Sequence, residues 1–234
     1  MTELLYMRVW YLKEFDASVV SVEGNLVELD KTAFYPLGGG QPNDTGKIFS
    51  NSREFSVVNV FKKEGKVFHE VDKEGLKPGD KVRGIIDWKR RYKLMRMHTA
   101  AHVLSEVIHR ETKALITGNQ LGLEHSRIDY NLENFDREKI LECVERANEI
   151  IKKDLPVKIY FLKREEALKI PNISKLAKFV PPNLPELRIV EIEGFDIQAD
   201  GGTHVKRLSE IGKIKIVKME NKGKNNRRVY YELE

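Results

Sequence analysis

The hydrophobic pattern of the chain changes at one point, near Asp87. Before it, short β-branched and apolar runs are separated by turn signals rich in Gly, Pro and Asn, which is typical of short strands. After it, the segment 88–110 contains no Gly or Pro and repeats apolar residues at helical spacing. The switch predicts a β domain over residues 1–86, followed by a domain of helices and strands over residues 87–234.

The N-terminal runs have the length and spacing of strands in a small barrel. We expect strands there at residues 18–22, 26–29, 55–60 and 66–71. The second domain mixes both patterns, which predicts an α+β fold with an antiparallel sheet. Its predicted helices are 88–110, 137–153, 164–169 and 174–178, and its predicted strands are 187–193, 195–199 and a hairpin of 213–219 with 228–233.

The composition excludes several classes of protein. With 234 residues, 41% of them hydrophobic, the chain can bury a sizeable core without cross-links. Its one cysteine, Cys143, excludes a disulfide framework and a zinc cluster built from cysteines. No apolar run approaches the roughly 18–20 residues that cross a bilayer, and the first residues lack a secretory signal pattern. We expect a soluble protein of the cytoplasm.

The sharpest local motif is the pair His98 and His102. Residues four apart lie on one face of a helix, so both imidazoles can reach one metal ion. A zinc protease would carry Glu directly after the first His to act as the base, whereas this chain has Thr99. The pair therefore indicates a metal site of another kind, or two histidines without a metal.

A second cluster late in the chain strengthens the metal interpretation. Asp200 and His204 flank Gly201-Gly202, a pair that permits a tight turn with unusual backbone angles. Imidazole nitrogen and carboxylate oxygen are both common zinc ligands, so the four groups would suit Zn²⁺. Three protein ligands would leave an open position for water, and four would close the site. A plain turn, with His204 as a strand residue, is the alternative.

Together, these motifs resemble a known family. The His-x-x-x-His motif at 98–102, followed late in the chain by Gly-Gly-Thr-His at 201–204, resembles the editing domain of alanyl-tRNA synthetase. The segment 30–46, which contains Gly38-Gly39-Gly40, resembles the glycine-rich motif of the small barrel that precedes that domain. The chain is too short to hold an aminoacylation domain as well. It is therefore similar to the free-standing AlaX-type editing proteins, in their medium form.

The resemblance implies a translation-factor-like β-barrel, an α+β editing domain with one Zn²⁺, and hydrolysis of tRNA(Ala) charged with serine or, in some members, glycine. It implies that His98, His102 and His204 bind the zinc. It also places the loop Gly38–Gly40 near the editing site, where it modulates activity. The family carries Cys where this chain has Asp200, so Asp200 binds the metal directly, binds it through water, or acts as a base beside it.

Further polar residues are candidates for contact with the amino acid. Serine differs from alanine by a hydroxyl, and a site that hydrogen-bonds this hydroxyl strongly rejects the analogue that lacks it. The candidates are Thr99, Thr117, Asn119 and Gln120, and an ordinary polar turn is the alternative for the last three. The three glycines could press backbone amides against a phosphate or form a barrel turn. They lack the Lys-Ser/Thr of a P-loop, which excludes an ATP site of that kind.

Two clusters of basic residues predict RNA binding. The net charge of +5 is small for a chain of this length. Only a local cluster of basic residues can therefore indicate an acidic partner. Cations of this kind contact phosphates without reading sequence, and a solvated charged face is the alternative. The candidates are Arg90 and Arg91 at the start of the first helix, and Lys215, Lys218, Arg227 and Arg228 in the C-terminal hairpin.

Two other functions remain open from the sequence. One is an editing domain of the threonyl-tRNA synthetase type, acting on Ser-tRNA(Thr), which the glycine-rich motif disfavours. The other is a non-catalytic tRNA-binding module whose zinc is structural, which Asp200 in place of Cys favours.

Overall fold

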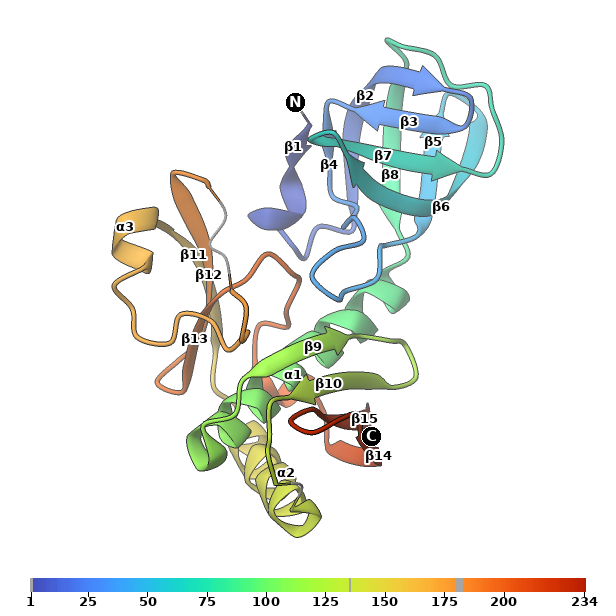
Figure 1. Cartoon of the computed structure of the whole chain (residues 1–234). Coiled ribbons are helices and arrows are strands. Elements are labelled where there is room, and N and C mark those ends of the chain that lie inside the picture. The colour runs from blue at the N-terminus through green and yellow to red at the C-terminus, as the bar shows by residue number, and fades with distance from the viewer. Residues whose placement is uncertain (1, 135, 180–182) are drawn as a thin grey trace. The chain divides into compact units, whose positions relative to one another are not determined.

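Six antiparallel strands close into a barrel in the first unit of the computed structural model. The chain divides into the units Met1–Lys93 and Leu94–Glu234, and the structure describes residues 2–134, 136–179 and 183–234. Around the barrel the strands follow the order β2 (Glu14–Glu23), β3 (Leu26–Leu29), β7 (Lys66–Val71), β6 (Arg53–Lys63), β5 (Gly46–Ser50) and β8 (Lys81–Ile86) (Figure 1). The predicted barrel is confirmed.

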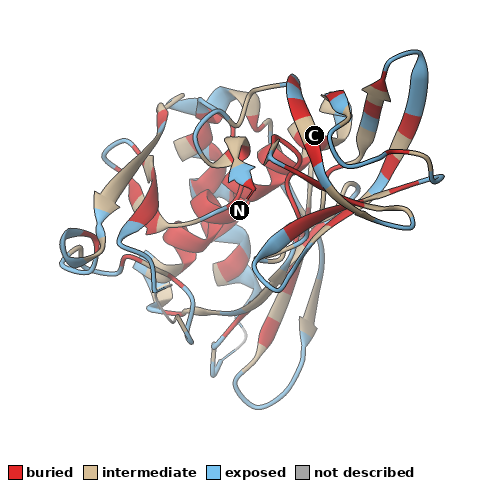
Figure 2. Ribbon diagram, turned by 90° about the horizontal axis from the view of Figure 1, so that it is seen from above, coloured by how far each residue is buried: buried red, intermediate tan, exposed pale blue. Residues whose placement is uncertain are grey.

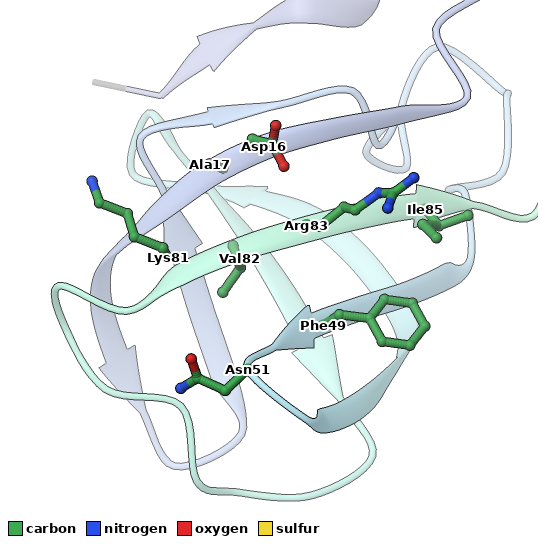
Figure 3. A pocket seen from close by; sticks show the side chains of 8 residues that line it. All are labelled: Asp16, Ala17, Phe49, Asn51, Lys81, Val82, Arg83 and Ile85. Atoms are coloured by element: carbon green, nitrogen blue, oxygen red, sulfur yellow. The ribbon is translucent and has the colours of Figure 1, made fainter.

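Two short elements accompany the barrel. Strands β1 (Glu3–Leu4) and β4 (Lys31–Thr32) pair in parallel, and a 3-10 turn, Leu5–Met7, follows β1. Side chains that alternate along the barrel strands fill its interior. This core includes Phe15, Val27, Phe34, Ile48, Phe55 and Val60, all buried. On the outside, a hollow of about 540 Å³ lies over β2, β5 and β8 and is lined by Phe49 and Arg83 among others (Figure 3).

One of the polar side chains buried in the barrel unit is His69 on β7, which is fully buried. Its Nδ1 lies 3.0 Å from the carbonyl oxygen of Val27, and its Nε2 lies 2.8 Å from the Thr32 hydroxyl. A carbonyl can only accept, so Nδ1–H donates to Val27 and Nε2 accepts from Thr32. Both nitrogens are thus satisfied by neutral partners, and burial lowers the pKa of His69 to about 4.

Two long helices frame the second unit. Helix α1 (Trp88–Thr112) begins at the predicted position, and the Asp87 carboxylate accepts from the Arg90 backbone N–H at 3.1 Å, as an N-cap does. Helix α2 (Arg137–Lys152) is likewise confirmed, with Asp136 as its cap. Many residues of the helices are buried (Figure 2). Among the described residues, no helix combines the length and apolarity needed to cross a membrane.

Two antiparallel sheets complete this unit, which confirms the α+β prediction. One has the order β14 (Ile214–Asn221), β15 (Arg227–Leu233), β10 (Ser126–Tyr130) and β9 (Ile116–Gln120). The other comprises β11 (Val157–Lys163), β12 (Glu186–Ile192) and β13 (Asp196–Ala199). Short helical turns occupy Arg164–Ala167 (α3) and Leu208–Glu210.

The helix predicted at 174–178 is wrong. The segment runs beside β9, where the Ile116 N–H donates to the Lys175 carbonyl and the Ala177 N–H donates to the Ile116 carbonyl. Pairing with a neighbouring strand satisfies the backbone and outweighs the local helical pattern. It also carries the Lys175 side chain into the interior, where 5% of it is exposed.

Candidate metal centre

Four side chains of the second unit converge on one point: His98 and His102 from α1, and Asp200 and His204 from the segment after β13. Their ligand atoms all lie within 4.8 Å of one another. Oδ2 of Asp200 lies 3.5 Å from His98 Nε2 and 3.9 Å from His102 Nε2, and its Oδ1 lies 3.1 Å from His204 Nε2. Ligands about 2.0–2.2 Å from a tetrahedral zinc lie roughly 3.3–3.6 Å apart. The group could therefore hold a metal ion.

The helix places the first two histidines by periodicity alone, because four residues make about one turn. Their ring centroids are 5.2 Å apart, and the His204 ring lies 4.3 Å from His98 and 4.7 Å from His102. All three histidines are buried. The Asp200 side chain is 24% exposed and is thus the part of the group most open to solvent.

A hydrogen-bond network fixes the orientation of His204. The Thr99 hydroxyl donates to the Met95 carbonyl at 3.0 Å and accepts from the Val205 N–H at 3.1 Å. Its proton is therefore used, so the contact of 3.2 Å with His204 Nδ1 is a bond that Nδ1–H donates. The Nε2 lone pair then faces the Asp200 carboxylate. Two acceptors in contact are unfavourable unless a cation lies between them, which is the arrangement of a metal ligand.

A buried ionic chain lies behind His102. Its Nδ1 is 3.5 Å from Asp196 Oδ2, longer than an ordinary hydrogen bond. Asp196 Oδ1 lies 3.2 Å from Lys175 Nζ, which lies 2.9 Å from Glu106 Oε2. Arg110 donates to the other oxygen of Glu106 at 2.6 Å. The carboxylate nearest His102 is thus itself held in place, as in the outer shells that orient metal-bound imidazoles.

The loop that carries Asp200 is held by a backbone N–H of its own and by the Arg188 side chain. The Gly202 N–H donates to Asp200 Oδ1 at 2.6 Å, and Arg188 Nη1 donates to the Asp200 carbonyl at 2.8 Å. The unusual backbone angles expected for Gly201 and Gly202 are not found, since neither is among the glycines with positive φ. No atom lies within 4 Å of a Cβ built on Gly201, so no steric reason explains that glycine.

The pKa values suit a cation at the centre. Burial lowers the pKa of His98 to about 4 and that of His204 well below its usual value. Burial would also lower the pKa of His102, but the carboxylates of Asp196 and Asp200 outweigh it and raise that pKa to about 9. Burial alone would raise the pKa of Asp200, but the histidines hold it well below its usual value. At neutral pH the group offers a carboxylate and two neutral imidazoles, and a metal would displace the proton on His102.

The residues predicted to contact the amino acid are placed differently. Thr99 is fully buried with its hydroxyl used on His204 and the backbone, which corrects the substrate contact expected of it. The other three lie on strand β9 rather than in a turn. Thr117 donates to Asn226 at 2.9 Å, and Gln120 accepts from Arg127 at 3.1 Å. Substrate contact by Thr117, Asn119 and Gln120 remains a prediction.

The glycine loop of the barrel unit forms a tight turn. Gly38 and Gln41 exchange backbone hydrogen bonds of 3.2 and 2.9 Å. Gly39 and Gly40 have φ of 60° and 81°, angles that side chains disfavour, so the turn requires glycine at both positions. At Gly38 the backbone carbonyl accepts from the Tyr35 hydroxyl at 3.1 Å. The loop's modulating role remains a prediction.

Two of the predicted RNA-binding arginines serve the fold instead. Arg91 is fully buried and donates to Asp44 and to the carbonyls of Trp10 and Ala33. Arg227 is 5% exposed and donates to Asn221 and to the carbonyls of Gly223, Lys224 and Glu133. A buried guanidinium with internal acceptors cannot reach a phosphate, which corrects the prediction for both.

The remaining cations differ in accessibility. Arg228 donates to both oxygens of Asp129, at 2.6 and 2.8 Å, and 18% of its side chain is exposed, so it too is engaged in the fold. Arg90 donates to the Asn43 carbonyl at 3.0 Å. Lys215 and Lys218 have exposed side chains, 57% and 61%, in surface ion pairs that a phosphate can replace. Phosphate binding by Arg90, Lys215 and Lys218 remains a prediction.

Sequence reasoning missed the residues around the ligands, chiefly Asp196, Lys175 and Arg188. Only Glu106 carried a usable signal, because it continues the spacing of four that starts at His98 and His102. The others come from distant segments, and no local pattern marks a partner brought in from another strand.

Comparison with known families gives two matches. Residues 3–90 match the model of tRNA synthetases class II (A), and residues 187–230 match the threonyl and alanyl tRNA synthetase second additional domain. The first covers the barrel and the start of α1. The second includes Asp200 and His204.

Whole-chain relatives are also found. The chain is 53% identical over 237 residues to the alanyl-tRNA editing protein AlaX-M of Saccharolobus solfataricus, with 100% of both chains covered. It is 52% identical over 241 residues to AlaX-M of Methanosarcina barkeri, covering 100% of this chain and 99% of the relative. It is 41% identical over 223 residues to the alanine–tRNA ligase of Methanococcus maripaludis, covering 94% of this chain but 24% of the ligase.

Proposed function

The chain belongs to the AlaX-M family of alanyl-tRNA editing proteins, and we propose that it hydrolyses, in trans, tRNA(Ala) mischarged with serine or with glycine. Editing of a charged tRNA cleaves the ester between amino acid and ribose, so the chain is a hydrolase. The observation that carries the proposal is the buried group of His98, His102, Asp200 and His204, with its lone pairs directed at one point.

We propose Zn²⁺ as the metal, with these four side chains as its ligands. Neutral imidazoles and a carboxylate are donors that zinc accepts. When bound, zinc polarises an ester carbonyl and lowers the pKa of a coordinated water. Both oxygens of Asp200 face histidine nitrogens, which supports a direct ligand over a base set beside the metal.

The chain's own residues have distinct tasks in this proposal. Thr99 holds His204 in the tautomer that leaves Nε2 unprotonated, and the Asp196 carboxylate, 3.5 Å from His102 Nδ1, favours a proton on that nitrogen. Asp200, the most exposed member of the group, marks the side from which the ester approaches. Thr117, Asn119 and Gln120 are proposed to hydrogen-bond the serine hydroxyl. Such a bond favours serine over alanine, which lacks the hydroxyl.

The loop Gly38–Gly40 is proposed to modulate the reaction. Lys215, Lys218 and Arg90 are proposed to contact the phosphates of the tRNA, which adds affinity without sequence recognition. A reaction on charged tRNA takes place where proteins are synthesised, in agreement with the cytoplasmic location expected from the sequence.

A deacylation panel tests the function. Ser-, Gly- and Ala-tRNA(Ala) are incubated with the protein, with Ser-tRNA(Thr) as the control for the threonyl type. We expect hydrolysis of Ser-tRNA(Ala) and survival of Ala-tRNA(Ala). Elemental analysis should find about one equivalent of zinc per chain, one ion for one four-ligand group. Binding of tRNA without hydrolysis of any charged form would instead support a non-catalytic module.

A further inference from the structure

Both tryptophans of the chain lie in one aromatic cluster of the barrel unit. Trp10 and Tyr11 have ring centroids 6.2 Å apart, Tyr11 and Trp88 are 5.4 Å apart, and Trp88 and Tyr92 are stacked at 5.9 Å with an interplanar angle of 27°. The four rings thus form a continuous row. We call it the aromatic row.

The aromatic row lies outside the hydrophobic core of the barrel. None of its members is among the buried residues of that core, and each of the four side chains is half-buried. Beside Trp10, Val9 is 52% exposed. Large aromatic side chains usually contribute to a core or to an interface, so four of them in one partly exposed row indicate a binding surface.

The charge around the aromatic row is positive. The Lys13 ammonium lies 4.9 Å from the Trp88 ring centroid, and Lys89 is exposed on the same turn of α1. The two nearest acidic residues along the chain are already engaged. Asp87 caps α1, and Glu14 accepts from Arg83 at 2.5 Å. Exposed cations beside aromatic faces are the combination that binds single-stranded nucleic acid.

We propose that the aromatic row is a stacking surface for unpaired nucleotides of RNA. Bases would stack on the parts of the rings that stay exposed, and Lys13 and Lys89 would bind the phosphates between them. Bases in a duplex are stacked on one another and cannot reach such rings, so the surface favours single strands. Every charged tRNA carries an unpaired 3′ end. The identification of this RNA as tRNA rests on the proposed function, whereas the stacking itself does not.

Tryptophan emission reports directly on the proposal, because both tryptophans belong to the row. The full chain is titrated with a short single-stranded RNA ending in CCA and, separately, with a blunt RNA duplex of the same composition. We expect saturable quenching by the single strand and much weaker quenching by the duplex. Quenching should weaken as salt is raised, since phosphate contacts release counterions.

Variants separate stacking from charge. Trp88→Leu and Tyr92→Leu keep apolar bulk but remove a ring, and each should weaken binding of the single strand roughly 5- to 100-fold, the loss of one base–aromatic stack. Trp10 remains as the reporter in both. The matched control is Phe61→Leu, which removes a ring from another stacked pair of the same unit, Phe61 and Phe68 at 6.0 Å. It should bind normally.

Each outcome decides the proposal. Equal affinity of the ring variants and of Phe61→Leu would overturn it, as would preference for the duplex. Circular dichroism shows whether a variant is folded, and Trp10→Leu, with Trp88 as the reporter, serves if Trp88→Leu is not. A protein that shows this quenching but deacylates no tRNA would overturn the proposed function and leave the stacking surface in place. Full activity with unchanged KM for tRNA in folded ring variants would overturn the identification of this RNA as tRNA and leave the proposed function in place.

Discussion

Two buried histidines, His69 in the barrel unit and His204 in the second unit, each contact a threonine hydroxyl but use it in opposite ways. Both are fully buried, and burial lowers the pKa of both. His69 donates to a carbonyl and accepts from Thr32. His204 instead donates to Thr99, whose own proton is used on Met95, and its remaining lone pair faces a carboxylate.

The difference is one of complementarity. Around His69 each lone pair meets a donor, so the site is complete without any added atom. Around His204 an acceptor faces an acceptor, an arrangement that a bound cation would satisfy. Burial and low pKa are common to both, so neither property identifies a functional histidine. What separates them is the group that faces Nε2, a hydroxyl that donates at His69 and a carboxylate at His204.

Removal of a ligand should have the largest effect. Asp200→Ala takes away the carboxylate that faces all three histidines, so metal content and deacylation should fall together, with activity down at least about 1,000-fold, beyond the 10–100-fold cost of an outer-shell partner. Metal content is measured by elemental analysis and activity by deacylation of Ser-tRNA(Ala). Asp200→Cys, which restores a zinc ligand, should retain metal. Full metal content in Asp200→Ala would make the carboxylate a base rather than a ligand.

The buried His69 should make the free energy of unfolding depend on pH. The pKa of His69 falls from 6.5 to about 4 on folding, so below pH 6.5 the unfolded chain binds a proton that the folded barrel does not. Stability is therefore complete above pH 6.5 and is lost as pH falls toward 4, by up to about 3 kcal/mol at 1.36 kcal/mol per pKa unit. Urea unfolding between pH 7 and 4 measures this loss.

The matched variant for that experiment is His69→Gln, because an amide can supply one donor and one acceptor without titrating. It should flatten the pH dependence while metal content stays unchanged. An imidazole signal for His69 that titrates near pH 6.5 in the folded protein would contradict the assignment.

The sequence predicted the group of His98, His102, Asp200 and His204 because its geometry is local. His98 and His102 lie one helical turn apart, and Asp200 and His204 are brought together by a short loop. The starts of both long helices could also be predicted, because Asp87 and Asp136 are capping residues at the positions where the hydrophobic period changes.

Contacts between distant segments could not be predicted. Thr99 meets His204 across 105 residues, and no spacing rule distinguishes a threonine that orients an imidazole from one that binds substrate. The basic run around Arg91 predicts a phosphate contact, but Arg91 is buried and donates to Asp44, 47 residues earlier. The residues next to Arg91 in the sequence do not indicate that it forms a buried salt bridge with a distant carboxylate.

Removal of a hydroxyl should affect the two histidines differently. Thr99→Val keeps the shape but leaves His204 Nδ1–H and the Val205 N–H without their acceptor, so metal affinity should fall about 10–100-fold. Competition with a chelator measures it. The paired variant, Thr32→Val in the barrel, removes a partner of His69 and should cost about 1–3 kcal/mol of stability without changing metal affinity. Equal metal affinity in both variants would contradict the orienting role of Thr99.

The smallest effect should come from Asp196→Asn, which keeps the shape of the side chain nearest His102 but removes its charge. The contact with His102 Nδ1 is long, 3.5 Å, so less of the ligand's orientation depends on it than on the shorter bond from Thr99. We expect about a tenfold loss of metal affinity, at the lower end of outer-shell effects. Glu106→Gln is the matched control, because Glu106 shares the Lys175 ammonium with Asp196, whereas the carboxylate beside His102 Nδ1 is that of Asp196. If both variants lose affinity equally, the ionic chain acts on the metal centre by supporting the fold. If only Asp196→Asn does, the carboxylate orients His102 as the Thr99 hydroxyl orients His204, and the two ligands are held by a charged and a neutral partner of the same function.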